Sequence, residues 1–269
     1  MNLRRVRALV RKEWQETLRN PMLVLTFAVL LAVFGILPAA LALAAEPLAA
    51  SRANTSSLAP LQKGLAVRYP GFARMAAASQ LRVVLYRQFH VFFLVLPVVG
   101  AMSIATYSLI GEKTARSLEP LLATPLTTKE LLFAKSVAAA APATAATWAV
   151  ALLHAGAARA ICGAEAFAMA FDAPSFWLLA LVTPLVGFLG LLVGVAASSR
   201  ATDPRAAQQV GALLVLPVVA VFAGQAGGLF LLSVPLVLAG ALAVAVLDAV
   251  ALGMAIALFD RERMLTRWR

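Results

Sequence analysis

The chain has 269 residues, of which 62% are hydrophobic and only 13% are charged, and its mean hydropathy is +0.89. Apolar residues make up about half of a typical soluble domain, so this composition excludes an ordinary soluble protein and indicates a polytopic membrane protein. The net charge of +11 does not indicate nucleic-acid binding, because membrane topology also demands basic loops. The single cysteine, Cys162, excludes an internal disulfide and a cysteine-based zinc site.

Residues 1–20 predict an amphipathic helix that lies in the membrane interface. The apolar residues at helical spacing are Leu3, Val6, Val10, Trp14 and Leu18. The basic residues on the remaining faces are Arg4, Arg5, Arg7, Arg11, Lys12 and Arg19. In such a helix the tryptophan lies at headgroup depth.

The apolar run 22–45 is the first predicted transmembrane span. Ala42-Leu43-Ala44 has the small-residue spacing of a signal-peptide cleavage site, so a secretory signal peptide is the rival interpretation. However, the run exceeds the roughly 7 to 15 residues of a signal-peptide core and is long enough to cross about 30 Å of hydrocarbon. We therefore interpret it as a retained span.

Five further apolar runs complete a predicted all-α bundle of six transmembrane helices. These runs cover approximately residues 89–110, 134–156, 174–198, 206–224 and 234–259. Residues 46–88 are more polar and predict an outer loop with one short amphipathic helix between Phe72 and Arg87. Pro97 should kink the second span because it removes a backbone hydrogen bond. Glycines and Pro235 interrupt the last pair of spans, so part of 220–235 is a candidate re-entrant segment.

The basic residues predict the orientation of this bundle. With the N-terminus inside, 16 of the 23 Lys and Arg residues fall in cytoplasmic segments and 7 fall in outer loops. The positive-inside rule therefore places both termini in the cytoplasm. The first outer loop holds most of the exceptions.

Residues 111–135 form the longest charged interruption of the sequence. Thr127 and Glu130 have the spacing of a capping box, which predicts that a helix begins at about Thr127. Pro125 disfavours helical geometry at Thr124, so a preceding short helix should end there. We expect a helix, a turn and a second helix, with Lys129 and Glu130 in water, as a docking surface for a soluble partner.

Residues that could carry chemistry are few. The chain has no Gly-Lys dipeptide and hence no P-loop, and its only histidines are His90 and His154, of which His154 is expected to be packed or interfacial. We predict no catalytic residue and no metal site. Asp248 lies near the middle of the sixth span, where a charge costs about 3 kcal/mol, so it is either a proton or cation site or a hydrogen-bonded structural residue. Gly190 and Gly194 form a small-xxx-small pattern that indicates helix packing.

These residues leave two functional classes open. The segment 111–135 favours the membrane subunit of a pump driven by a separate ATPase, because such a subunit needs a protruding helix to receive force. Asp248 favours a secondary transporter or ion channel. A secondary carrier usually contains an internal repeat, and no convincing repeat is present in the sequence.

Several segments carry a resemblance that bears on this choice. Glu112, residues 118–126 (LEPLLATPL), Glu130-Leu131-Leu132 and Lys135 resemble the signature of ABC-2 type transporter permeases. In that family the loop after the second span carries the coupling helix that engages the ATPase. Ala115-Arg116-Ser117 stands where the family usually has a glycine. Residues 11–21 and 259–268 are similar to the family's amphipathic N-terminal helix and C-terminal tail.

The resemblance implies the membrane subunit of an ATP-driven exporter in the cell (inner) membrane. Its implied partners are cytoplasmic ABC ATPase subunits, a second identical or sister permease, and membrane lipids, but no nucleic acid. This chain would hold no cofactor, because ATP and Mg²⁺ are bound by the ATPase. The implied ATPase-coupling residues are Glu112, Glu119, Leu121, Leu122, Thr127, Lys129, Glu130 and Leu131. The candidates for the translocation path are Pro97, Gly100, Gln208, Gln209 and Asp248.

Overall fold

The computed structural model describes residues 3–50, 52–114, 128–200 and 203–258. Its regular elements are helical, and the search of these residues finds six helices long and apolar enough to cross a membrane. The predicted fold class, an all-α membrane bundle, is confirmed. The membrane-length segments contain α2 (Pro21–Leu43), α5 (Ala77–Phe92) with α6 (Val95–Thr114), α8 (Thr128–Ala170), α10 (Thr183–Arg200), α11 (Pro204–Ala226) and α12 (Val234–Leu258).

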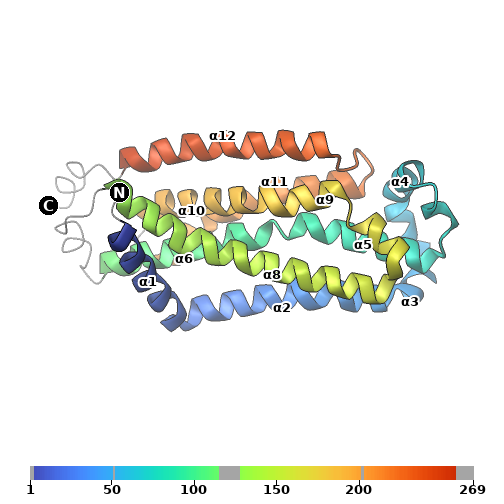
Figure 1. Ribbon diagram of the computed structural model, residues 1–269, viewed down its shortest axis with the longest axis horizontal. Helices are drawn as coiled ribbons and strands as arrows, with labels where there is room; N and C mark the ends of the chain where they lie inside the picture. Colours follow the sequence, from blue (N-terminus) through green and yellow to red (C-terminus); the bar gives the residue numbers. More distant parts are fainter. Residues whose placement is uncertain (1–2, 51, 115–127, 201–202, 259–269) are drawn as a thin grey trace.

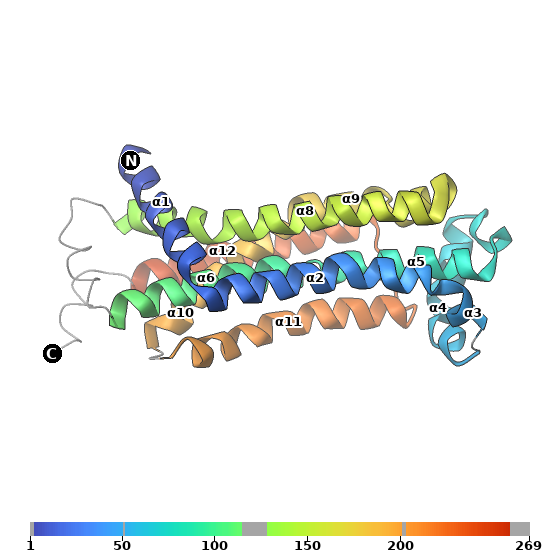
Figure 2. The same cartoon turned by 90° about the horizontal axis from the view of Figure 1, so that it is seen from below.

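The long helices lie side by side along the longest axis of the molecule (Figure 1). The amphipathic helix α1 (Leu3–Arg19) crosses one end of the bundle obliquely, and the end of α12 lies at the same end (Figure 2). The helices α3 (Ala45–Ala50) and α4 (Arg52–Arg68) cover the opposite end. We refer to these two ends as the α1 end and the α4 end.

Pro97 explains the break between α5 and α6. The helix α5 stops at Phe92 and α6 begins at Val95, so the interruption falls at the position four residues before Pro97. A proline ring clashes with the carbonyl of that residue, here Phe93, and cannot donate the hydrogen bond that it would accept. The predicted kink in this helix is confirmed.

The stretch 46–88, predicted to be mainly a loop, is largely helical. After α3 and α4 come a single 3₁₀ turn, η1 (Phe72–Arg74), and then α5, which begins at Ala77. Leu81, Val84 and Tyr86 are buried in a cluster or against neighbouring helices. The basic and amide residues of this helix, Gln80, Arg82, Arg87 and Gln88, obscured its apolar face in the sequence, although each of them donates at least one hydrogen bond to another part of the chain.

The connection between the last two spans is a turn. The helix α11 ends at Ala226 and α12 begins at Val234, with Gly228 in the left-handed region at φ +70°. A side chain there would also collide with Pro60 of α4. Residues 220–235 therefore comprise a helix end, a short non-helical connection and a helix start, and do not form a re-entrant helix.

The helices α6 and α10 form the closest pair at the centre of the bundle. A Cβ on Gly190 would lie 2.6 Å from the carbonyl oxygen of Val98, and one on Gly194 would lie 3.1 Å from that of Met102. The predicted role of these glycines in helix packing is confirmed. Before α10, the chain passes through α9 (Ala173–Trp177) and the π-helical turn η2 (Leu178–Val182).

Candidate functional site

The helix α1 is fixed on the bundle by apolar contacts and by one indole hydrogen bond. Val6 and Leu9 pack with Ala134 of α8. The Trp14 Nε1–H donates to the carbonyl oxygen of Ala138 at 3.0 Å. Asn20 follows α1 and is the N-cap of α2, because its Oδ1 accepts from the first backbone N–H groups of α2. The amphipathic pattern of the sequence thus becomes a helix attached to α8 and directed into α2.

A buried ionic network, which we call the inner network, joins α1 to α6 and α8. It consists of Glu13 on α1, Ser108 and Glu112 on α6, and Lys135 on α8. The Lys135 Nζ lies 2.9 Å from Glu13 Oε1 and 2.9 Å from Glu112 Oε2. Ser108 Oγ donates to Glu13 Oε2 at 2.6 Å and accepts from Lys135 Nζ at 2.8 Å. One ammonium group therefore connects carboxylates on two different helices.

Lys12 extends this network towards solvent. Its Nζ lies 3.2 Å from Glu112 Oε1 and 3.5 Å from Glu16 Oε1. Burial works to raise the pKa of Glu13, but Lys135 and the Ser108 hydroxyl outweigh it and hold that pKa below its ordinary value. Burial works to lower the pKa of Lys12, but the Glu112 carboxylate outweighs it and raises that pKa. The geometry therefore stabilises the charged forms.

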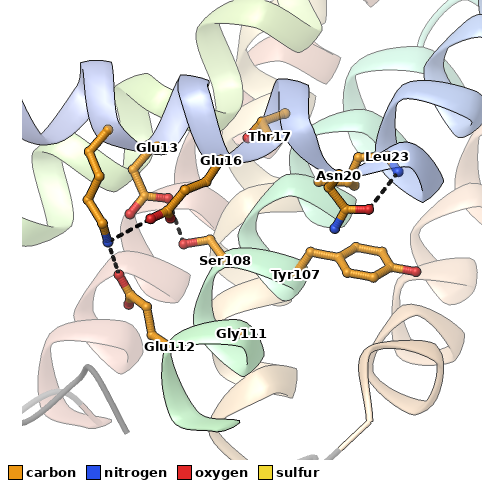
Figure 3. A pocket seen from close by; sticks show the side chains of 10 residues that line it. Glu13, Glu16, Thr17, Asn20, Leu23, Tyr107, Ser108, Gly111 and Glu112 are labelled. Atoms are coloured by element: carbon orange, nitrogen blue, oxygen red, sulfur yellow. Dashed lines mark hydrogen bonds and ion pairs between the residues drawn. The ribbon is translucent and has the colours of Figure 1, made fainter. Parts of the chain in front are cut away.

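A polar pocket of about 230 Å³ lies beside the inner network. Figure 3 shows Glu13, Glu16 and Thr17 on the ribbon of α1, opposite Tyr107, Ser108 and Glu112 on the ribbon of α6. The pocket is lined by Lys12, Glu13, Glu16, Thr17, Asn20, Leu23, Tyr107, Ser108, Gly111 and Glu112. The junction between α1 and α6 is therefore polar and incompletely filled.

The inner network lies at both ends of the predicted docking segment. The helix α6 ends at Thr114, two residues after Glu112, and α8 begins at Thr128, seven residues before Lys135. The direct contact between Glu112 and Lys135 therefore closes the loop that contains residues 115–127. At this position, charged groups on the three helices α1, α6 and α8 share their partners.

The predicted coupling residues fall into three groups in the structure. Glu112 belongs to the inner network. Glu130, which was expected in water, lies in the first turn of α8 and is only 5% exposed. The predicted coupling residues that lie outside the described part of the chain are Glu119, Leu121, Leu122 and Thr127, together with the side chains of Lys129 and Leu131. The helix that was predicted to begin at about Thr127 begins at Thr128.

The five predicted path residues lie at different places in the bundle. Pro97 faces Gly187 of α10, and a Cβ on Gly100 would meet Phe27 of α2. Gln208 Nε2 donates to Ser103 Oγ of α6 at 3.3 Å. The neighbouring Gln209 is exposed on α11, and Asp248 is buried on α12. The structure of a single chain does not bring them together along one path.

The members of the inner network other than Glu112 were not predicted as site residues. In the sequence, Lys12 is part of the amphipathic pattern, and Lys135 and the residues around Glu13 are part of the family resemblance. The signal that could have identified Lys135 is its position, since it is a charge that enters the apolar run of the third span.

A second buried ionic network, the outer network, lies at the α4 end. The Arg87 Nη1 of α5 donates to Asp172 Oδ2 at 2.9 Å and to the carbonyl oxygen of Met169 at 2.8 Å. Tyr69 and Ser175 also donate to the Asp172 carboxylate, at 2.7 and 2.9 Å. Burial works to raise the pKa of Asp172, but Arg87 and these hydroxyls outweigh it and lower that pKa.

Gly163 is the position of a kink in α8, on the segment that leads to the outer network. It has φ +76° and ψ 178° inside α8, a conformation open only to glycine, and the helix kinks there. The chain beyond the kink carries the Met169 carbonyl and Asp172 to Arg87.

The two histidines pack together near the outer network. His90 and His154 are fully or almost fully buried, with ring centroids 5.4 Å apart, and His154 also lies against Tyr86 and Phe93. The packed environment expected for His154 is confirmed. Among the described residues, no group of three or more His, Cys, Asp and Glu side chains is arranged to hold a metal ion.

The fold is that of a multi-pass membrane protein, since the described residues include six helices long and apolar enough to cross a membrane. The chain belongs to the ABC-2 family, because the family model described as ABC-2 family transporter protein matches residues 7–235, from α1 to the start of α12. Neither a curated protein nor a solved structure matched the chain. As a family member it is a membrane transport subunit and is not itself catalytic.

Proposed function

We propose that this chain is the membrane subunit of an ATP-driven exporter and that the inner network transmits the movement of a separate ATPase to the transmembrane helices. The observation that carries the proposal is the position of Lys135. Lys135 follows the segment 115–127 and binds Glu112, which precedes this segment, at 2.9 Å. It also binds Glu13 of α1 at 2.9 Å. A displacement of this segment therefore cannot move α6 or α8 without loading α1.

The docking surface proposed for the ATPase is the cytoplasmic segment 111–135. Glu119, Leu121, Leu122, Thr127, Lys129 and Leu131 are the proposed contact residues. Glu112 and Glu130 have a different proposed role, because their side chains are buried: they transmit movement within the permease. ATP and Mg²⁺ are bound by the ATPase in this proposal.

The central pair of helices gives the movement a route through the membrane. The helix α6 carries Ser108 and Glu112, and its backbone touches α10 at Gly190 and Gly194. Close-packed backbones transmit displacement because they cannot be compressed. We therefore propose that α6 and α10 move as one unit when the docking segment is pushed.

A second permease subunit, identical or related, completes the proposed transporter. In one chain α6 is almost entirely covered, whereas α11 is mostly exposed. The exposed Gln209 of α11 would face the translocation path between the two subunits, and the apolar faces of α2 and α12 would face lipid. The α1 end is the proposed cytoplasmic side of the cell membrane, as the distribution of basic residues favours.

The first experiment is purification of the tagged full-length chain from its native membrane in a mild detergent. Mass spectrometry of co-purifying proteins and a vanadate-sensitive ATPase assay follow. A co-purifying P-loop ATPase is the expected result. A chain that purifies alone and carries an ion down its gradient in liposomes would instead establish a secondary transporter or channel.

The second experiment tests the role of the inner network in the purified complex. Glu112→Gln should leave the ATPase bound, because Glu112 is buried, but should abolish most of the part of ATP hydrolysis that depends on the permease. Glu46→Gln is the matched control, since Glu46 is a carboxylate at the α4 end with a 78% exposed side chain. Equal hydrolysis by both variants would contradict transmission through Glu112.

A further inference from the structure

Asp248 lies deep in the membrane-spanning part of α12. A rise of 1.5 Å per residue places it about 21 Å from Val234 and about 15 Å from Leu258, the two ends of α12. Only 5% of the residue is exposed, so it faces the bundle and not the lipid. Val244 and Leu252, one helical turn away on either side, belong to the apolar clusters that α12 shares with α10.

Among the described residues, the helices that pack most against α12 carry no charge except at the end of α10. The helix α12 makes its main contacts with α10 and smaller ones with α9 and η2. The sequences of α9 and η2 contain no ionisable residue, and α10 contains only Arg200, its last residue. Asp248 is itself the only ionisable residue of α12. Within the described part of the chain, neither of its carboxyl oxygens has a hydrogen-bond partner.

Two other buried carboxylates, Glu13 and Glu112, and the largely buried Asp172 have a different environment. Glu13, Glu112 and Asp172 each have a lysine or arginine nitrogen at 2.9 Å. Each of these three carboxylates therefore has a cation in direct contact. An isolated carboxylate in an apolar environment takes up a proton instead, because the neutral acid avoids the loss of hydration that a buried charge suffers.

We propose that Asp248 is an intramembrane proton-binding site, whose carboxyl group holds a proton while α12 is packed on α10 and exchanges it when the two helices separate. The ligand is a single proton, and the binding group is the side chain of Asp248 alone. The proposal goes beyond the transport function proposed above and does not depend on the ATPase, since it concerns the isolated permease.

A protonated carboxyl group in an apolar site reacts with hydrophobic carbodiimides. The acid transfers its proton to one nitrogen of dicyclohexylcarbodiimide, and a carboxyl oxygen bonds to the central carbon, which gives an O-acylisourea. Rearrangement of the acyl group to nitrogen gives a stable N-acylurea. Nothing leaves, so the modified residue gains the mass of one reagent molecule.

The experiment treats the full-length chain in liposomes at neutral pH with dicyclohexylcarbodiimide and maps the adduct by mass spectrometry. We expect the adduct on Asp248 and at least tenfold less on Glu13 and Asp172, which serve as internal controls. A membrane protein of known carbodiimide reactivity in the same liposomes confirms that the reagent is active. Labelling of this standard without labelling of Asp248 would overturn the proposal.

Infrared spectroscopy provides an independent measurement that needs no reagent. The wild-type chain should have a carbonyl stretching band of a protonated carboxylic acid at neutral pH, and Asp248→Asn should lose it. In D₂O the isotope shift of this band should develop slowly, because α10 covers the group. A band that is absent from the wild type, or present equally in the variant, would overturn the proposal.

Discussion

The inner and outer networks use similar charges in different ways. In the outer network the Arg87 guanidinium binds both a carboxylate and the backbone carbonyl of Met169, so it fixes a corner between α5 and the α8–α9 connection. In the inner network Lys135 is shared by carboxylates on two helices. Arginine presents a rigid planar fork, whereas the lysine ammonium is a rotatable point charge. The comparison indicates a fixed corner at the α4 end and a junction that can change partners at the α1 end.

The largest effect is expected from Lys135→Met. It leaves Glu13 and Glu112 buried without their shared cation, and breaking a buried pair in this way costs about 3–5 kcal/mol. The midpoint of thermal unfolding in detergent should fall by several degrees. The double variant Lys135→Met with Glu13→Gln should recover part of this loss, because it removes the Glu13 charge, whereas Glu112 still pairs with Lys12 at 3.2 Å. A single variant as stable as the wild type would contradict the buried network.

Arg87→Met tests the fixed corner. Asp172 keeps Tyr69, Ser175 and the more distant Arg68, so the expected loss is smaller, about 2–3 kcal/mol. Arg87→Lys should rescue little, because a point charge cannot replace the fork. The ATPase should bind this variant normally, as measured by co-purification. Loss of ATPase binding at unchanged stability would contradict the separation of roles between the two networks.

Gly190→Ala tests the central contact that lies between the two networks. Its Cβ would lie 2.6 Å from the Val98 carbonyl oxygen, so α6 and α10 must separate, at a cost of about 1–3 kcal/mol. Gly240→Ala is the matched control, because a Cβ there meets no atom within 4 Å. In a helix interior this control should be neutral or stabilising by up to about 1 kcal/mol. Unfolding midpoints of both variants give the comparison.

Acidification should lower the stability of the protein through Asp172 by less than the substitution of Arg87 does. The pKa of Asp172 is lower in the folded protein, so its contribution to stability is present above the ordinary aspartate pKa and is lost as the pH falls through the lowered value. Protonated Asp172 still bonds Tyr69 and Ser175. Unfolding midpoints measured against pH should decline in the acid range less steeply for Asp172→Asn than for the wild type. Parallel curves would contradict the assignment.

The smallest effect is expected from Glu16→Gln. Its pair with Lys12 joins two substantially exposed side chains at 3.5 Å, which is worth about 0.2–0.5 kcal/mol. Lys12 also retains Glu112. The unfolding midpoint should therefore be nearly unchanged, and raising the salt concentration should remove the remaining difference. A loss as large as that of Lys135→Met would mean that the network depends on its exposed edge.

The sequence predicted those features that depend on local patterns. Long apolar runs predicted the six spans, helical spacing predicted α1, and Pro97 predicted the break before α6. The inner network could not be predicted in this way, because Glu13 and Lys135 are 122 residues apart and neither periodicity nor spacing relates them. The short amphipathic helix predicted between Phe72 and Arg87 corresponds to the start of α5, but its continuation to Phe92 was missed. Arg82 and Arg87 resemble loop residues until their partners, the Ala42 carbonyl and Asp172, are known.

The separation of Glu13 from Lys135 also sets an order of events during synthesis. Glu13 and Glu112 are made before the cation that they share, and the 122 residues between Glu13 and Lys135 take about 6–25 s to translate at 5–20 residues per second. Until the third span leaves the ribosome, α1 lacks both its ionic partner and the helix that it packs on. The final docking of α1 is therefore a late step in biogenesis, although α1 is synthesised before the two helices that it contacts through the inner network.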